Sequence, residues 1–451
     1  MSSSEIAAAH RYPFAARGAP FQVASTEGCY LVTPDGRRVL DAAGGAVVVN
    51  IGHGRREVAE VYAQAAAEAT YVVPTFVTPS RARLVERLLD RWVPPGITRV
   101  VFTCGGSESV DGAVRLARQH HVSAGRDSRY KVIGRELSYH GVTLATLAVG
   151  GHGKRRAGFE PLLQAQPKAP ACYCFRCPLE RSYPECDVAC AGALEEVILR
   201  EGPDTVAAFI AEPIGGSTAG ALVPPDEYWP RVVEICRRYG VLVIADEVMT
   251  GYGRTGAKFG VDHWGITPDI LIGGKGLTGG YAPMGAIFAT DAVVEPIVAN
   301  GDELMFYTYS AHPAGCAVAD KVLEILERER LVERAAAMGR VLRAALDRLS
   351  SHPNVADVRG RGLLYAVELV RDRTTREPFA KEARLTAKVI AAGLADDVFF
   401  YPGGTDPARD VITLGPPFIV TEAEIDRMVD VLGRAITSAV ERVDGRVAAA
   451  S

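Results

Sequence analysis

The stretch "PDILIGGKGLTGGYAPMGA" (residues 268–286) places Lys275 directly after a short apolar run and among glycines. Apolar, β-branched runs bounded by Pro and Gly are typical of buried strands. A cation at the end of such a strand is costly to desolvate unless it has a partner or a chemical role. Lys275 is therefore either a solvated loop residue or a functional amine, and the rest of the chain decides between the two.

The chain contains further apolar runs of strand length, separated by segments with helical spacing of apolar residues. The predicted strands lie at residues 99–103, 130–134, 206–213, 241–247, 269–274 and 285–290. Helical spacing marks residues 107–118, and the helical pattern of residues 227–240 ends on Gly240, a common helix stop. Strands that alternate with helices predict an α/β fold with a mostly parallel sheet covered on both faces.

The pattern changes near residue 316, where long helices, a strand segment (355–370) and a closing helix (422–440) follow. We therefore predict three regions. They are a segment 1–70 that contributes to the small domain and the site, a large domain 71–315, and a smaller α+β domain 316–451.

Composition excludes several classes of protein. The 451 residues are 48% hydrophobic and 23% charged, with a net charge of −4, as in soluble globular proteins. This charge argues against a general binder of nucleic acid or anionic membranes. No apolar stretch is long enough to span a membrane, and the first twenty residues lack the apolar core of a secretory signal. We expect a cytoplasmic protein.

Five of the nine cysteines lie close together, with the spacing C-x-C-x2-C-x8-C-x3-C. They are Cys172, Cys174, Cys177, Cys186 and Cys190. A thiolate metal site usually repeats C-x2-C, which this segment does not, so we expect free thiols and no bound metal. A structural metal and a disulfide remain the alternatives, the second disfavoured in a reducing compartment.

Unusual residues follow several of the predicted strands, where open parallel sheets gather function. After "VVFT", Gly105 and Gly106 precede Ser107 at a predicted helix start, a pattern suited to a phosphate monoester and also to an ordinary N-cap. After "VLVIA", Asp246 and Glu247 need a salt-bridge partner or a role, and Asp246 could face a cationic ring nitrogen.

Two further strand ends carry candidate groups. Glu212 follows "VAAFIA", and Tyr139 with His140 follows "KVIG" by a few residues. The Tyr139 ring could stack on an aromatic ligand or simply pack. A phosphate cradle, a stacking ring, an acid for a ring nitrogen and a lysine for an aldehyde together predict a pyridoxal-phosphate site.

With these motifs the sequence resembles the class III pyridoxal-phosphate-dependent aminotransferases, of the ω-amino acid or amine:pyruvate type. The resemblance runs through "GGSESVDGAVRLAR", "SYHG", "IAEPIGG", "IADEVMTGYGRTG", "GGKGLTGGYAPMGA" and "YTYSAHP" to "PPFIVTEAEID". It implies the fold-type I large domain and a homodimer whose active sites lie at the subunit interface.

The resemblance also implies roles for individual residues. Lys275 would bond to the cofactor's aldehyde carbon, and Asp246 would hold the ring nitrogen. Gly106 and Ser107 would bind the phosphate, and Thr308 would bind it from the neighbouring subunit. Tyr139 and Val248 would contact the two faces of the ring, and His140 and Glu212 complete the predicted cofactor contacts. Two departures from the family pattern, Met249 and Cys104, lie beside these residues.

The substrate residues are predicted by analogy. Val47 in "GGAVVVN" and Phe76 in "YVVPTF" would line the pocket, and Arg409 in "YPGGTDPARDVITLGPPF" would pair with a substrate carboxylate. The predicted reaction is transamination from an amine or an ω- or β-amino acid to pyruvate or another 2-oxo acid. Decarboxylation, aminomutase or racemase chemistry on the same cofactor is the alternative. A cofactor-sensing transcription regulator is disfavoured, because no helix-turn-helix pattern appears.

Overall fold

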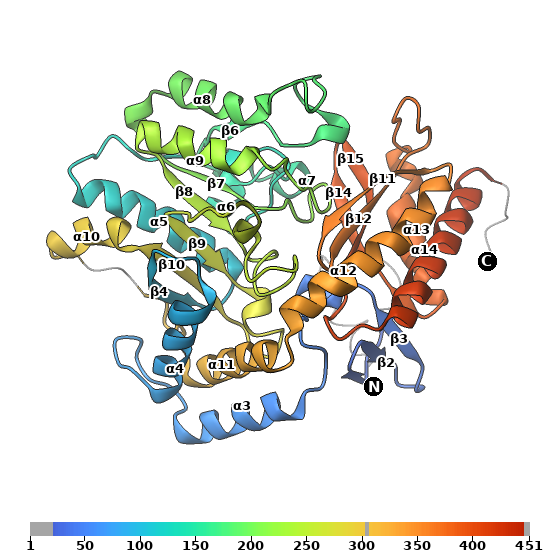
Figure 1. Ribbon diagram of the computed structural model, residues 1–451, viewed down its shortest axis with the longest axis horizontal. Helices are drawn as coiled ribbons and strands as arrows, with labels where there is room; N and C mark the ends of the chain where they lie inside the picture. Colours follow the sequence, from blue (N-terminus) through green and yellow to red (C-terminus); the bar gives the residue numbers. More distant parts are fainter. Residues whose placement is uncertain (1–20, 303–305, 446–451) are drawn as a thin grey trace.

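The computed structural model describes residues 21–302 and 306–445, and the segment predicted to lack a secretory signal lies outside them. Its centre is a seven-stranded sheet of order β4-β10-β9-β8-β7-β5-β6 (Figure 1). The strands are β4 (Ile97–Thr103), β10 (Gly285–Thr290), β9 (Ile270–Gly273), β8 (Leu242–Asp246), β7 (Val206–Ala211), β5 (Lys131–Arg135) and β6 (Lys168–Ala169). β10 alone runs antiparallel to its neighbours in this sheet. The predicted α/β fold with a mostly parallel sheet is confirmed.

Helices cover both faces of this sheet, because successive side chains of a strand point to opposite sides. On one face, Ile210, Ile244 and Ile270 pack with α5 (Gly106–Ser123) and α10 (Asp291–Ala299). On the other, Phe209 and Val243 pack with α8 (Ala189–Glu201) and α9 (Tyr228–Tyr239). Every residue of β7, β8 and β9 is buried, which explains why these strands read as continuous apolar runs.

The predicted strand and helix positions agree with the structure to within a few residues. The main difference is that β7 ends at Ala211 and β8 at Asp246, so that Glu212 and Glu247 lie outside the ladders. Both side chains can then turn toward loops rather than toward a packed face. The short helices α6 (Leu144–Val149) and α7 (Gly153–Arg156) follow β5.

The C-terminal part has an antiparallel sheet of order β11-β12-β15-β14. Its strands are β11 (Val355–Arg361), β12 (Leu364–Leu369), β15 (Ala408–Leu414) and β14 (Tyr401–Thr405). Figure 1 shows α13 (Leu385–Ala395) and α14 (Glu422–Val443) beside this sheet and α12 (Leu331–Asp347) leading to it. α11 (Pro313–Arg328) packs with α3 (Arg56–Glu68) and α4 (Pro79–Arg87).

A third, four-stranded sheet joins three N-terminal strands to a strand of the C-terminal part. The strands β1 (Ser25–Glu27), β2 (Tyr30–Val32) and β3 (Arg38–Asp41) precede the one-turn helix α2 (Gly44–Val47). β3 pairs in parallel with β13 (Val398–Phe399), with Leu40 opposite Val398. This pairing supports our proposal that the N-terminal segment contributes to the small domain. The domain limits 1–70, 71–315 and 316–451 stay a prediction.

Candidate active site

Strand register brings the candidate residues to one edge of the central sheet. Ala211 of β7 pairs with Ala245 of β8, and Asp246 pairs with Ile272 of β9. Glu212 therefore follows its strand beside Asp246, and Lys275 lies just beyond the end of β9. The three carboxyl ends meet where an open parallel sheet binds its ligands.

Lys275 occupies an unusual backbone conformation for a residue with a side chain. Its φ of +39° lies in the left-handed region, which costs about 1–2 kcal/mol for an L-residue and persists where the surrounding structure enforces it. The glycines around it allow close packing, since a Cβ at Gly274 would lie 3.3 Å from Val248 Cγ1. The pKa of the Lys275 amine is lowered by burial, against the opposing charges of Asp246 and Glu212. A lowered pKa enriches the neutral amine, which is the nucleophilic form.

Asp246 is buried and held from both sides. Its Oδ2 lies 2.7 Å from His140 Nδ1, and its Oδ1 accepts a hydrogen bond from the Val248 N–H at 3.1 Å. His140 Nε2 has no hydrogen-bond partner among the described residues. Sequence reasoning placed His140 beside the cofactor only because it follows Tyr139; its contact with the Asp246 carboxylate had no signal in the spacing.

Glu212 positions the backbone of Tyr139. Its Oε2 accepts from the Tyr139 N–H at 3.3 Å and its Oε1 from the Gly216 N–H at 2.9 Å. Burial raises the pKa of Glu212. The half-buried Tyr139 ring lies edge-on to His152, with a centroid distance of 6.2 Å, and the guanidinium carbon of Arg155 is 4.9 Å from the centroid of the Tyr139 ring.

Gly106 and Ser107 begin α5 and face the ends of β8 and β9. A Cβ on Gly106 would lie 2.9 Å from Val248 Cγ1, so the helix start needs glycine to approach this side chain. Ser107 Oγ accepts a hydrogen bond from the Val142 N–H at 3.3 Å. Ser109 Oγ lies 2.7 Å from Thr103 Oγ1 and donates to the Gly105 carbonyl at 3.1 Å, which fixes the helix start against β4.

These residues fit pyridoxal phosphate by their chemistry. The first turn of an α-helix leaves its N–H groups without intrahelical acceptors, and these groups attract phosphate. Val248 packs beside this turn, and a buried carboxylate and an amine of lowered pKa stand at the adjacent strand ends. Each handle of the cofactor thus has a matching group at one edge of the sheet.

Glu247, the second acid of the "DE" pair, has a structural role. Its Oε1 accepts from the Val261 N–H and its Oε2 from the Gly260 N–H, each at 2.8 Å, and the Thr250 hydroxyl also donates to it. Burial raises the pKa of Glu247 to about 7. Both oxygens accept hydrogen bonds from the backbone of one turn. We therefore assign this carboxylate a structural role and no contact with the cofactor or substrate.

The remaining predicted residues make their contacts elsewhere. Thr308 is exposed, and Phe76 is 66% exposed. Val47 is buried and has a φ of +57°, and a Cβ on Gly415 would lie 2.9 Å from its Cγ1. Arg409 Nε pairs with Asp406 Oδ1 at 3.0 Å. None of these contacts reaches Lys275, so the roles predicted for the four residues stay predictions.

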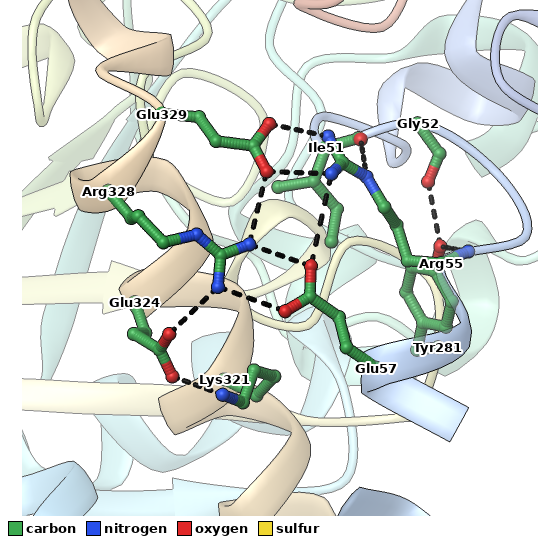
Figure 2. A network of polar contacts seen from close by, with 9 residues as sticks. All are labelled: Ile51, Gly52, Arg55, Glu57, Tyr281, Lys321, Glu324, Arg328 and Glu329. Atoms are coloured by element: carbon green, nitrogen blue, oxygen red, sulfur yellow. Dashed lines mark hydrogen bonds and ion pairs between the residues drawn. The ribbon is translucent and has the colours of Figure 1, made fainter. Parts of the chain in front are cut away.

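The segment after the glycines of "GGAVVVN" supports the loop that carries Lys275. The buried Asn50 side chain donates to the Gly276 carbonyl at 2.9 Å. Tyr281 Oη donates to the Gly52 carbonyl and accepts from the Arg55 N–H, each at 2.8 Å (Figure 2). These supports were missed from the sequence, because residues so distant along the chain give no local pattern.

The cysteine segment carries no evident metal centre. All nine cysteines lie in the described part of the chain and are free. Within that part no group of three or more His, Cys, Asp or Glu side chains is placed to hold a metal ion. Over the same residues, no helix has the length and apolar character needed to cross a bilayer.

Comparisons with known proteins agree with this geometry. Residues 14–436 match the family described as aminotransferase class-III. The chain is 38% identical to the taurine–pyruvate aminotransferase of Rhodobacter capsulatus, over 89% of this chain and 88% of that protein. It is 35% identical to the putrescine–pyruvate aminotransferase of Pseudomonas aeruginosa, over 90% and 88%. This chain belongs to the class III aminotransferases.

A solved structure extends the likeness to three dimensions. The omega transaminase from Pseudomonas jessenii, in complex with PMP, superposes with a TM-score of 0.92 at 32% identity. The match covers 98% of this chain and 99% of that chain. The class III aminotransferase is thus an enzyme of the transaminase type with the fold-type I architecture predicted for it.

Proposed function

We propose that this aminotransferase binds pyridoxal phosphate and transfers an amino group from an amine or an ω- or β-amino acid to pyruvate or another 2-oxo acid. The observation that carries the proposal is that Lys275, an amine of lowered pKa, and buried Asp246 lie at the ends of two neighbouring strands, at one edge of the sheet. The relatives named as taurine–pyruvate and putrescine–pyruvate aminotransferases support the choice of donor and acceptor.

The cofactor, when bound, supplies a conjugated ring that accepts electrons from the substrate carbon. We propose that the first turn of α5, with Gly106 and Ser107, holds its phosphate and that Tyr139 and Val248 contact its ring. Lys275 would hold the aldehyde carbon of the cofactor when no substrate is bound. As a free amine, its Nζ would take a proton from the donor's carbon and, in the second half of the reaction, give a proton to the corresponding carbon of the acceptor.

Asp246 would keep a proton on the ring nitrogen, since a nearby negative charge favours the protonated form. His140 would act on that carboxylate as a positioning residue, because its Nδ1 lies 2.7 Å from Oδ2 and fixes the carboxylate plane. Met249, in the place where many family members carry Gln, cannot donate a hydrogen bond to the cofactor. The ring hydroxyl would therefore lack that donor.

Exposed residues support the homodimer that the resemblance to the family implies. Phe76 is 66% and Tyr309 is 65% exposed, and Thr308 beside Tyr309 is exposed as well. Large exposed apolar side chains often mark interaction surfaces. We propose that they lie at a subunit interface, where Thr308 would reach the phosphate of the neighbouring site and Phe76 the substrate.

A requirement for two substrates separates transamination from its alternatives. Purified enzyme loaded with cofactor is given putrescine or taurine, with and without pyruvate, and alanine formation is measured. We expect multiple turnovers only when both are present, at about 1–10³ per second under saturation. Because putrescine and taurine have no carboxyl group and no stereocentre, a chiral amino acid is also supplied alone, and sustained carbon dioxide release or isomer formation from it would favour a decarboxylase, aminomutase or racemase.

A further inference from the structure

Arg254 is a buried arginine that binds segments from distant parts of the chain. Only 2% of its surface is exposed. Its Nη1 donates to the Leu363 carbonyl at 3.0 Å and to the Pro416 carbonyl at 2.7 Å, and its Nη2 donates to the Val49 carbonyl at 3.0 Å. The guanidinium carbon also lies 4.7 Å from the centroid of the Phe418 ring. One side chain that follows β8 thus contacts both the N-terminal segment and the C-terminal part.

The contact with Val49 connects Arg254 to the loop that carries Lys275. Val49 is followed by Asn50, whose side chain donates to the Gly276 carbonyl at 2.9 Å. Gly276 is the residue directly after Lys275. A displacement of the Val49 carbonyl would therefore move Asn50 and the hydrogen bond that holds this loop.

Arg254 is buried without a counter-ion. Among the residues that the structure describes, its guanidinium donates to backbone carbonyls and forms no ion pair. The carboxylate whose charge acts on it, Asp41, accepts from the N–H groups of Ala43 and Gly45 and lies 3.0 Å from His53 Nε2. Burial lowers the pKa of Arg254 to about 9, so the group is still charged at neutral pH. Because an unpaired buried charge is costly, we expect this charge to have a role beyond packing.

The charge of Arg254 acts on the Lys275 amine. Burial lowers the pKa of this amine, the charges of Asp246 and Glu212 oppose the effect, and the charge of Arg254 adds to it. A positive charge in the surroundings disfavours the protonated form of an amine. Arg254 therefore favours the neutral form of Lys275, which is the nucleophilic form.

We propose that Arg254 is a positioning residue for Lys275, which fixes residues 46–50 against the loop that carries the lysine and supplies a positive charge that acts on the amine. This inference rests on the proposed function and adds a residue to its site. Arg254 would act through the Val49 carbonyl, Asn50 and its own charge rather than by binding the substrate.

The chain offers a matched control in Arg129, which is 8% exposed. Its guanidinium also donates to three backbone carbonyls at 2.9 or 3.0 Å, those of Val206, Tyr239 and Gly240. It differs in having an ion pair, with the exposed Asp204 at 3.4 Å. Arg129 precedes β5, which runs parallel to its neighbour β7, so it lies at the opposite edge of the sheet from Lys275. Loss of carbonyl contacts should destabilise both variants, whereas only Arg254 should act on the lysine.

The first experiment measures the protonation of Lys275 in the enzyme without its cofactor. Wild type, Arg254→Gln, Arg254→Lys and Arg129→Gln are labelled briefly with acetic anhydride over a range of pH, and acetylation of Lys275 is followed by mass spectrometry. Because Arg254→Gln removes the positive charge, the pH midpoint for Lys275 should rise by about half a pH unit or more. Arg254→Lys should stay nearer to wild type, and Arg129→Gln should leave the midpoint unchanged.

Hydrogen exchange and turnover test the positioning. Residues 46–50 and 275–279 should exchange faster in Arg254→Gln and Arg254→Lys than in Arg129→Gln, because an ammonium group lacks the planar donors that reach three carbonyls. In the holoenzyme, kcat/KM for putrescine with pyruvate should fall ~10-fold or more in Arg254→Gln and less than about twofold in Arg129→Gln.

The outcomes separate this inference from the proposed function. A Lys275 midpoint that does not rise in folded Arg254→Gln, or that rises equally in Arg129→Gln, would overturn the inference and leave transamination intact. If Arg254→Gln does not fold, Arg254→Lys decides, and unchanged exchange in residues 46–50 would overturn the inference. A wild-type holoenzyme that turns over no pair of donor and acceptor would remove the proposed function. The midpoints measured without cofactor would still show whether Arg254 acts on Lys275.

Discussion

At the scale of single residues, the two acids of the "DE" pair have different surroundings, and we propose a chemical role for Asp246 alone. Asp246 meets one side chain and one backbone N–H, whereas Glu247 is saturated by two N–H groups and a hydroxyl. The sequence predicted Lys275 and Asp246 as candidates because each ends a buried strand. The sequence does not show which of the two carboxylates faces a loop, because this depends on the residue at which the pairing of β8 with its neighbours ends.

The pair gives a matched test of the role of Asp246. Asp246→Asn removes the negative charge and should slow the first half-reaction about 10²-fold or more, with the protein folded and cofactor retained. Glu247→Gln should retain the rate per folded enzyme but lower the free energy of unfolding by about 1–3 kcal/mol, because one backbone N–H would then face an amide donor. Stopped-flow absorbance and urea unfolding measure the two effects. A half-reaction that proceeds at the wild-type rate in Asp246→Asn would remove Asp246 from the mechanism.

At the scale of elements, the strands of the central sheet were predictable because burial on both faces leaves continuous apolar runs. The pairing of β3 with β13 was not, since Leu40 and Val398 are far apart in sequence and both strands are short. The ion pairs between α3 and α11 were not predictable from the sequence either, because these helices are far apart along the chain. Figure 2 shows Arg55 and Glu57 facing Arg328 and Glu329 across these helices.

Arg55 is the central residue of that network. Its two terminal nitrogens contact the two carboxylate oxygens of Glu329 at 2.7 Å, and its Nε donates to the Ile51 carbonyl at 3.0 Å. Because the pair is partly screened by solvent, we expect Arg55→Ala to lower the free energy of unfolding by about 1 kcal/mol. Hydrogen exchange of residues 50–57 should accelerate, while exchange in β8 should stay unchanged. Unaltered exchange around Asn50 would show that the network does not support the Lys275 loop.

At the scale of the whole molecule, we expect stability to depend on pH through three histidines, of which His121 and His152 are buried and His263 is half-buried. Burial lowers the pKa values of His121, His152 and His263 to about 4, from an ordinary value of 6.5. Between these values the unfolded chain binds protons that the folded chain does not, so stability falls as the pH falls. Glu247 acts in the opposite direction, since its raised pKa means that folding favours its protonated form.

The contribution of His121 can be isolated by substitution. Its Nε2 lies 3.0 Å from the Ala207 carbonyl, and His121→Asn removes its titration. The difference in unfolding free energy between variant and wild type should be constant above pH 7. Below about pH 6.5 it should shift in favour of the variant by up to ~1.4 kcal/mol per pH unit. A difference that stays flat down to pH 4.5 would contradict a lowered pKa at this site.

The overall fold and the candidate residue Lys275 were predicted from local patterns, whereas the residues that we propose for substrate binding come from distant segments. Arg155 on α7 and Arg409 on β15 line one cavity, and of the two only Arg409 was predicted from the sequence, by analogy with the family. The proposed function therefore depends on whether the edge formed by β7, β8 and β9 is the reactive centre.

The absorption spectrum of Lys275→Ala tests that claim most directly. The variant and wild type are purified with pyridoxal phosphate, and their visible spectra are recorded before and after addition of donor amine and then pyruvate. We predict that wild type shows a visible band that the amine removes and pyruvate restores. The variant should retain the cofactor through α5 but lack this band and its turnover. A variant that keeps the wild-type band and cycles between the two substrates would contradict the assignment of Lys275.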